Sequence, residues 1–260
     1  MKQKGITGST LKIIAVVTMI IDHIGASVLW MLLKERRILY AVSGLDTIFS
    51  LTGSDRTLAL LWWGMRIVVG RIAFPVFCFL LVEGFLHTKN AAKYTGRLFL
   101  FALISEIPFD LMLFENVYAP DYQNVFFTLL AGFLCMQGMS LVDRKSVENG
   151  RFHSFFSVFL KILIVVLGMS AGYFLKTDYG ASGVAFILLL YFFRGQKKRQ
   201  IAAGCVGSIL LLEEWAAPLA FLFIAFYKGK RGLKLKYLFY VIYPLHLFLL
   251  YLICVFLKTA

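Results

Sequence analysis

Long apolar runs alternate with short polar connectors along this 260-residue chain. A helix needs about 20 apolar residues to cross the hydrocarbon core of a bilayer. Nine segments reach or approach that length: residues 11–33, 66–87, 98–114, 123–142, 154–175, 182–194, 201–213, 215–227 and 236–257. The sixth to eighth segments are short, so we expect them to be tilted, half-spanning or extended by their flanks. The pattern predicts an all-α, polytopic integral membrane protein with about nine transmembrane helices, in a single domain over residues 1–260.

Two further elements precede the second span. Residues 58–70, which include Trp62, Trp63 and Arg66, indicate an interfacial helix leading into that span. The connector 34–57 is long and has apolar stretches around Ile48, which favours a partly folded surface element.

The composition supports the membrane assignment. Apolar residues make up 60% of the chain and charged residues 16%, whereas soluble domains are about half apolar and a quarter charged. This excludes a soluble enzyme, a disordered tail and a secreted disulfide scaffold. The four cysteines lie apart within apolar runs and form no CxxC pair, which favours buried packing residues over zinc or disulfide sites.

The positive charges predict the orientation. Most of the 27 Lys and Arg lie near the N-terminus or in the connectors 88–97, 143–153, 194–200 and 228–236, and the connector 115–122 has none. Basic connectors remain on the cytoplasmic side, so we expect a cytoplasmic N-terminus and an external C-terminus, with the basic connector 34–57 as an exception. The net charge of +13 then reflects topology and contact with anionic lipid. A nucleic-acid partner is not expected, because no folded domain offers a basic face.

Asp22 and His23 lie near the middle of the first apolar run. That run follows lysines as a signal peptide does, but it is too long for one and carries these polar residues at its centre, so we expect it to remain in the mature protein. Successive helical side chains diverge by about 100°, so one of the pair can line a cavity while the other contacts a neighbouring helix. A neutral imidazole can act as a general base near neutral pH. The alternative is a packing pair.

Glu106 and Asp110 are four residues apart and therefore lie on one face of the third span. Pro108 between them removes a backbone donor, which membrane helices tolerate where they line a cavity. The pattern favours a polar pocket in the outer half of the membrane. Ion pairing with Arg66 or Arg71 is a compatible alternative.

Three more polar residues lie within predicted spans. His246 is central in the last span, beside Pro244, and is either a functional imidazole or a structural hydrogen-bonding group. Asn124 begins the fourth span, where we expect it in the wall of the same outer pocket. Glu83 is explained by pairing with Lys89 or Arg97. The sequence has no P-loop, GxSxG or HExxH motif, and no metal site is expected.

Nine short motifs, read in order, resemble the TraX-like family of membrane proteins, which is named for N-terminal acetylation of F-pilin. They are LK at 11–12, TMIIDHIG at 18–25, GRIAFPVF at 70–77, VEGF at 82–85, SEIPFD at 105–110, QNVFFT at 123–128, DYG at 178–180, KY at 236–237 and YPLH at 243–246. The resemblance implies a multi-span acyltransferase of the cell membrane that uses cytoplasmic acetyl-CoA. It also implies that His23 is the catalytic base. The acceptor class stays open among a protein N-terminus, a glycan and a lipid head group.

The implied reaction assigns roles to the polar residues. Asp22, or a carboxylate from another helix, would hold the tautomer of His23, and His246 would orient the acceptor or stabilise the oxyanion. The acceptor pocket would be formed by Arg71, Glu106, Asp110 and Asn124. Cytoplasmic basic residues would bind the phosphates of acetyl-CoA, chiefly Lys89, Lys93, Arg97, Lys198 and Arg231.

Two other classes of function fit the same residues. A proton-coupled transporter could use Asp22, His23, Glu106 and Asp110 as a relay. Such folds usually carry internal repeats with paired broken helices, and the motifs here occur once each. A non-catalytic membrane assembly protein predicts no binding of acetyl-CoA and tolerance of substitution at His23.

Overall fold

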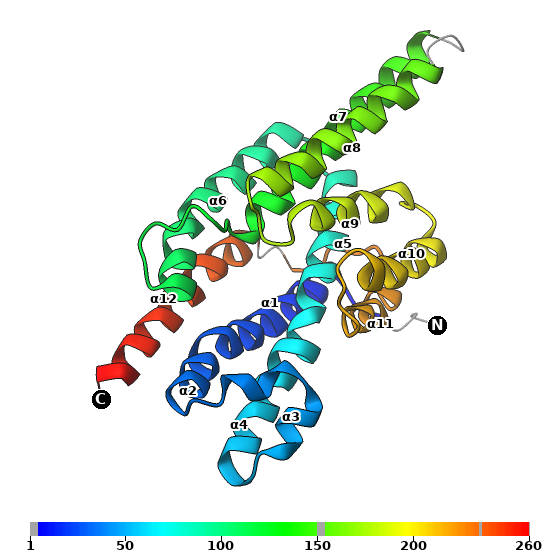
Figure 1. Ribbon diagram of the computed structural model, residues 1–260. Helices are drawn as coiled ribbons and strands as arrows, with labels where there is room; N and C mark the ends of the chain where they lie inside the picture. Colours follow the sequence, from blue (N-terminus) through cyan, green and yellow to red (C-terminus); the bar gives the residue numbers. More distant parts are fainter. Residues whose placement is uncertain (1–4, 150–153, 234–235, 260) are drawn as a thin grey trace. The chain divides into compact units, whose positions relative to one another are not determined.

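A computed structural model describes residues 5–149, 154–233 and 236–259 (Figure 1). In these ranges every extended regular element is a helix, which confirms the predicted all-α class. The main helices are α1 (Gly8–Ile24), α2 (Trp30–Glu35), α3 (Leu45–Ser50), α4 (Gly53–Trp63), α5 (Ala73–Leu86), α6 (Ala91–Phe114), α7 (Val125–Asn149), α8 (Ser154–Phe174), α9 (Gly180–Phe192), α10 (Lys197–Leu210), α11 (Ala220–Ala225) and α12 (Lys236–Thr259). Lys2, Lys4, Arg151 and Lys234, which contribute to the predicted orientation, lie outside the described residues.

Five helical stretches of the described chain are long and apolar enough to cross a membrane: Gly8–Glu35, Gly53–Leu86, Val125–Ser146, Phe155–Phe174 and Leu238–Thr259. The segment 182–194 corresponds to the shorter apolar helix α9. Segments 98–114 and 201–213 fall within α6 and α10, and 215–227 is divided between a 3-10 turn and α11. The count of nine spans and the cytoplasmic N-terminus stay predictions.

The second span is longer than the sequence indicates. The predicted interfacial helix over 58–70 is not a separate element, because helix continues from Gly53 to Leu86. The run changes from α to π geometry over Gly64–Val69 and to a 3-10 turn over Gly70–Ile72. A change of winding without a break accommodates the two glycines inside the apolar run.

The described helices group into two compact units. The first comprises residues up to 77, residues 105–118 and residues from 214, and the second comprises 78–104 and 119–213. Helices α5 and α6 each contribute to both. Units of this kind can be parts of one domain, so the single domain over 1–260 stays a prediction.

In the first unit, α1 packs against the segment 64–72 and against α12. Residues 33–63 fold beside them around a cluster of buried side chains formed by Leu33, Ile38, Ile48, Ala59 and Trp62. Arg36 donates a hydrogen bond to Asp55 at 2.7 Å on the exposed side of this element. The expectation of a partly folded element over 34–57 is confirmed.

The second unit is built on α7, α8 and α9, which pack against one another. Small residues allow close contact between these helices. A Cβ atom on Gly172 would lie 2.6 Å from the carbonyl oxygen of Gly180, and one on Gly132 would lie 2.7 Å from the Ile187 side chain. The glycines therefore set how closely the three helices pack.

Two of the sequence motifs meet in this unit. Residues 123 and 177 form an isolated parallel bridge, and the backbone N–H of Asp178 donates to the Gln123 carbonyl at 2.8 Å. The Thr128 hydroxyl bonds Thr177 at 2.9 Å. The motifs QNVFFT and DYG thus form one hydrogen-bonded connection between the start of α7 and the start of α9.

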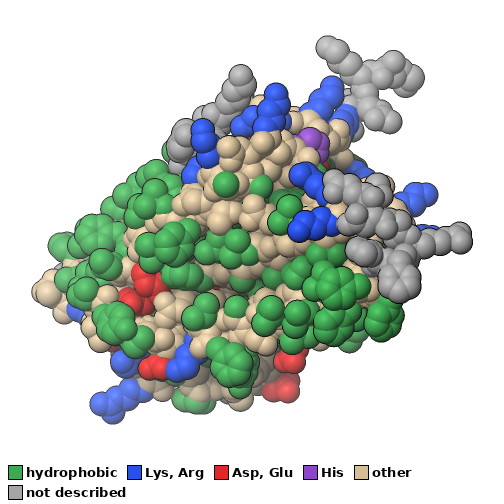
Figure 2. All heavy atoms as spheres, turned by 90° about the horizontal axis from the view of Figure 1, so that it is seen from above, with side chains coloured by type: hydrophobic (Ala, Val, Ile, Leu, Met, Phe, Trp, Pro, Cys, Tyr) green, Lys and Arg blue, Asp and Glu red, His purple; other side chains and the backbone are tan. Residues whose placement is uncertain are grey.

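Many large hydrophobic side chains face outward. On α8 these include Phe155, Ile162, Val166 and Leu167, each more than half exposed. Figure 2 shows hydrophobic side chains over much of the visible face. Soluble monomers rarely expose such contiguous apolar surface, so these helices have the surface of a membrane protein.

Asn124 provides a test of how the second unit is held together. It is fully buried, accepts a hydrogen bond from the Phe126 N–H at 3.0 Å and donates one to the Ala102 carbonyl at 2.8 Å. We expect Asn124→Ala to destabilise the protein by about 2 kcal/mol, because it removes a helix cap and leaves a buried carbonyl with one partner fewer. Thermal unfolding in detergent measures the effect.

Asn116 is the matched control. It accepts the same type of bond, from the N–H two residues further on, at 3.3 Å, but it is exposed. Asn116→Ala should leave the unfolding midpoint nearly unchanged. Equal changes of the unfolding midpoint in the two variants would show that the burial of Asn124 does not add to the stability of the protein.

Candidate functional site

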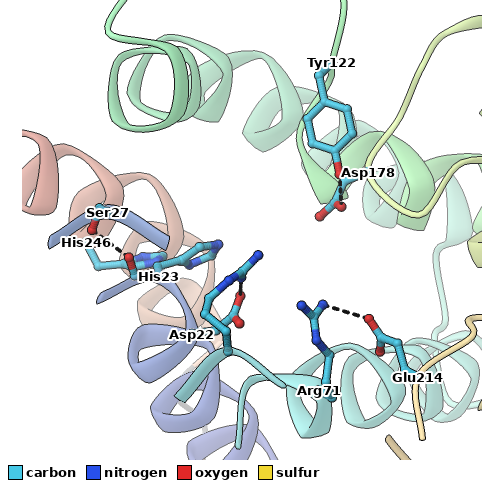
Figure 3. Close-up of polar contacts among 9 residues, drawn as sticks. Asp22, His23, Ser27, Arg71, Tyr122, Asp178, Glu214 and His246 are labelled. Carbon is cyan, nitrogen blue, oxygen red and sulfur yellow. Dashed lines mark hydrogen bonds and ion pairs between the residues drawn. The ribbon is translucent and has the colours of Figure 1, made fainter. Parts of the chain in front are cut away.

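Two histidines from opposite ends of the sequence meet in the first unit. Nδ1 of His23, on α1, lies 2.7 Å from Nε2 of His246, on α12. The ring centroids are 4.9 Å apart, and the rings are tilted by 35° (Figure 3). His246 is buried and His23 is partly buried. The contact places a histidine pair inside two membrane-length helices.

A second hydrogen bond assigns the protons of this pair. Nδ1 of His246 lies 2.8 Å from the carbonyl oxygen of Ile242, which can only accept, so Nδ1 of His246 carries the proton. In the neutral ring, Nε2 of His246 is then the acceptor, and the proton between the rings belongs to Nδ1 of His23. The network therefore leaves Nε2 of His23 with a lone pair.

The surroundings fix the orientation of both rings. Tyr243 is buried, and its ring meets that of His23 edge-on at 6.1 Å and that of His246 at 5.6 Å. Pro244 lies inside α12 between Tyr243 and His246. The motif YPLH thus supplies the hydrogen-bonding ring and the aromatic side chain that packs against it.

Asp22 pairs with an arginine. Nη1 of Arg66 lies 2.5 Å from Oδ2 of Asp22, and the two side chains are 25% and 16% exposed. The prediction that a carboxylate holds His23 does not match this arrangement, because among the described residues the ring of His23 bonds a second imidazole. Adjacent residues of α1 point in different directions, so Asp22 faces Arg66 while His23 faces α12.

Two glycines make room for this ion pair. A Cβ atom on Gly70 would overlap the Asp22 carboxylate, with Cγ of Asp22 only 2.6 Å away. A Cβ atom on Gly25 would lie 2.8 Å from Cγ of Arg66. Both glycines belong to motifs quoted above, and their physical role is to let two helices and a charged pair approach closely.

Both helices change winding at the site. A π-helical segment over Gly25–Leu29 begins two residues after His23, and Arg66 lies in the π segment Gly64–Val69. The Ser27 hydroxyl donates to the His23 carbonyl at 2.6 Å. Single π turns inside α-helices occur frequently at functional sites.

A second ion pair lies in the same unit. Nη1 of Arg71 donates to Oε1 of Glu214 at 2.8 Å, with side chains 20% and 11% exposed. Arg71 also interacts electrostatically with Asp22. Figure 3 shows the labelled residues of this unit in the order His246, His23, Asp22, Arg71 and Glu214. Histidines and two ion pairs therefore form one polar region.

The other residues assigned to the acceptor pocket are divided between the units. Asp110 is buried and Glu106 is partly buried on the portion of α6 that belongs to the first unit. Asn124 belongs to the second unit, where its described bonds cap α7 and hold α6. Contact of these side chains with an acceptor stays a prediction.

The basic residues assigned to acetyl-CoA are also divided. Lys89, Lys93 and Lys198 are exposed in the second unit, and Arg97 lies there with its guanidinium 5.4 Å from the Tyr94 ring centre. Arg231 belongs to the first unit. Binding of phosphate by any of them stays a prediction.

Arg231 lies in a basic loop that is bonded to the start of α1. The N–H groups of Gly8 and Ser9 donate to the carbonyls of Lys230 and Arg231 at 2.8 and 3.0 Å. Gly232 has φ of +74°, and a side chain there would collide with Thr7 and Ser9. The loop 228–232, which also contains Lys228, therefore presents its charges at the helix end that precedes His23.

Metal chemistry has no support in the described side chains. No group of three or more His, Cys, Asp or Glu residues among them is arranged to hold a metal ion. The absence of a metal from the reaction stays an expectation.

The sequence did not identify the partner of Arg71. Glu214 is separated from Arg71 by 143 residues, and no spacing rule connects them. The signal available was chemical, since an acidic residue between two apolar segments and an arginine inside another each require an opposite charge.

Gly70→Ala tests the space that the structure reserves for Asp22. We expect the substitution to lower the unfolding midpoint, with a loss of about 1–3 kcal/mol from steric overlap with the carboxylate. Gly64→Ala is the control, because a Cβ atom there meets nothing within 4 Å and alanine favours helix by about 0.5–1 kcal/mol. A Gly70→Ala protein as stable as the Gly64→Ala protein would contradict the described packing.

Comparison with known proteins agrees with the sequence motifs. The chain matches the family described as TraX protein over residues 7–254. It is 33% identical over 210 residues to the probable fimbrial assembly protein FimC, serogroup H1, of Dichelobacter nodosus, in an alignment covering 70% of this chain and 80% of the relative. No solved structure matches the chain. The family match covers almost the whole sequence, and the chain is a member of the TraX protein family.

Proposed function

We propose that this protein is an acetyltransferase of the cell membrane. It moves an acetyl group from cytoplasmic acetyl-CoA to an amine or hydroxyl acceptor at or across the membrane. The observation that carries the proposal is the hydrogen-bond chain from His23 through His246 to the Ile242 carbonyl. This chain holds a neutral imidazole with its Nε2 lone pair available, as a general base requires.

The reaction uses His23 twice. Nε2 of His23 accepts the proton of the acceptor amine or hydroxyl as that group attacks the thioester carbonyl. When the tetrahedral intermediate collapses, the C–S bond breaks and His23 returns the proton to the sulfur, releasing CoA as the thiol. His246 holds the ring and its tautomer throughout, as the third member of a catalytic triad does.

The position of the basic loop 228–232 is compatible with binding the acetyl donor, acetyl-CoA. The start of α1 at Gly8, where the loop is bonded, is 15 residues before His23, which corresponds to about 22 Å along a helix. An extended phosphopantetheine arm has a comparable length. The phosphates of acetyl-CoA would therefore lie at Lys230 and Arg231 while the thioester reaches His23.

The relative points to the first acceptor to test. Because that protein is described as a fimbrial assembly protein, we infer a role in fimbrial assembly and choose the N-terminal amine of a fimbrial subunit. Glycans and lipid head groups are the other candidates for the same chemistry.

Substitution of the two histidines tests the proposed base. With labelled acetyl-CoA and a peptide carrying a free α-amine, we expect His23→Ala to lower kcat about 10²–10⁴-fold, the usual contribution of a general base. His246→Leu should also lower kcat, because it leaves the tautomer of His23 undefined. His246→Gln should retain more activity, because its amide oxygen can accept the bond from His23.

His87→Ala is the control for these variants. His87 is exposed and its Nδ1 lies 2.8 Å from the Glu83 carbonyl, so it resembles His246 without contacting His23. Unchanged transfer by a folded His23→Ala protein would refute the mechanism. Absence of transfer by the unmodified protein to amine, glycan and lipid acceptors would refute the function.

The proposed role of the loop 228–232 in binding phosphate is tested with two acetyl donors, acetyl-CoA and S-acetylpantetheine. The double substitution Lys230→Glu and Arg231→Glu should raise KM for acetyl-CoA about 10-fold or more, because charge-assisted hydrogen bonds contribute about 1.5–3 kcal/mol each. The KM for S-acetylpantetheine, which lacks the phosphates, should not change. Lys176→Glu, on an exposed residue of another connector, is the control. Equal changes for both donors would place the phosphates elsewhere.

A further inference from the structure

Arg66 has donors that its ion pair does not use. A guanidinium carries five N–H groups. Within the described residues, Arg66 donates one hydrogen bond, from Nη1 to Oδ2 of Asp22 at 2.5 Å. The side chain is 25% exposed, so the protein does not enclose it completely. An arginine inside a membrane-length helix is costly, and one ion pair leaves most of its hydrogen-bonding capacity available.

The guanidinium is bound by the residue that precedes the proposed base. Asp22, which binds it, is adjacent to His23 in α1, and Arg66 and His23 interact electrostatically. Gly25 and Gly70 leave the space that the side chains of Arg66 and Asp22 occupy. Arg71, the other arginine of the region, is engaged with Glu214 at 2.8 Å. Its pairing with the residue next to His23 therefore distinguishes Arg66 from Arg71.

On the basis of the proposed acetyl transfer, we propose that Arg66 is the oxyanion-stabilising residue of the reaction and that Asp22 is the residue that positions it. When the acceptor attacks, the thioester carbonyl oxygen acquires a negative charge as His23 takes the proton. An N–H of Arg66 donates to that oxygen. When the C–S bond breaks, the carbonyl re-forms and Arg66 returns to its initial state, so it exchanges no proton or electron.

This role has a kinetic signature. Preorganised donors act on the charge that develops in the transition state, so their loss lowers kcat more than it raises KM. Arg66→Ala should lower kcat about 10²–10³-fold, the effect of removing one oxyanion donor, and leave KM for acetyl-CoA within about 3-fold of its original value. Arg66→Lys should lose less, because it keeps the charge but not the fork of donors.

The assay uses the full-length protein in detergent with acetyl-CoA and the same peptide amine. Added guanidinium ion should restore part of the activity of Arg66→Ala, which a purely structural defect would not allow. Asp22→Asn should lower kcat less than Arg66→Ala, with KM for acetyl-CoA unchanged. Asp22→Glu should recover part of the loss.

Arg36→Ala is the matched control, since it breaks an arginine–aspartate pair of the same unit that is exposed and lies on the element 33–63. Unfolding midpoints show that each variant is folded. A folded Arg66→Ala protein with kcat within about 3-fold of the original would overturn the role of Arg66 while leaving the acetyl transfer intact. An unmodified protein without transfer to any acceptor would overturn the proposed function and, with it, this inference.

Discussion

A polar side chain inside an apolar, membrane-length helix requires a partner within the protein, and this constraint organises the first unit. The aliphatic surroundings offer no hydrogen bonds, so His23 bonds His246 and Asp22 bonds Arg66. Each contact joins α1 to a different helical segment. The pairing of these polar groups therefore holds α1 against α12 and against the segment 64–72.

The same constraint prepares the chemistry. A histidine pair closed by a backbone carbonyl has one arrangement of protons in its neutral form, and that arrangement leaves Nε2 of His23 as a base. The ion pair fixes a guanidinium nearby without using all of its donors. Groups that are ordered before the substrate binds need no reorganisation during the reaction. Structural pairing and proposed catalysis thus depend on the same contacts.

Much of the fold and part of the site follow from the sequence. The apolar runs predict the helices, and polar residues at mid-span identify Asp22, His23 and His246 as informative. The sequence does not reveal which of them meet, because His23 and His246 are 223 residues apart and helix packing decides their contact. The sequence also predicts a separate interfacial helix over 58–70, since the tryptophans and arginines there are typical of a membrane interface, whereas the structure continues the helix through this segment. The sequence predicts Asn124 as a pocket residue but does not reveal its described bonds, which cap α7 and connect it to α6.

Nitrogen-15 NMR of the histidine-labelled protein tests the central claim most directly. The chain has four histidines, and the variants His23→Ala and His246→Gln assign the signals of the pair. The account predicts a protonated Nδ1 and an unprotonated Nε2 for His23, with coupling across the hydrogen bond from Nδ1 of His23 to Nε2 of His246. A protonated Nε2 on His23, or no coupling between the rings, would contradict it.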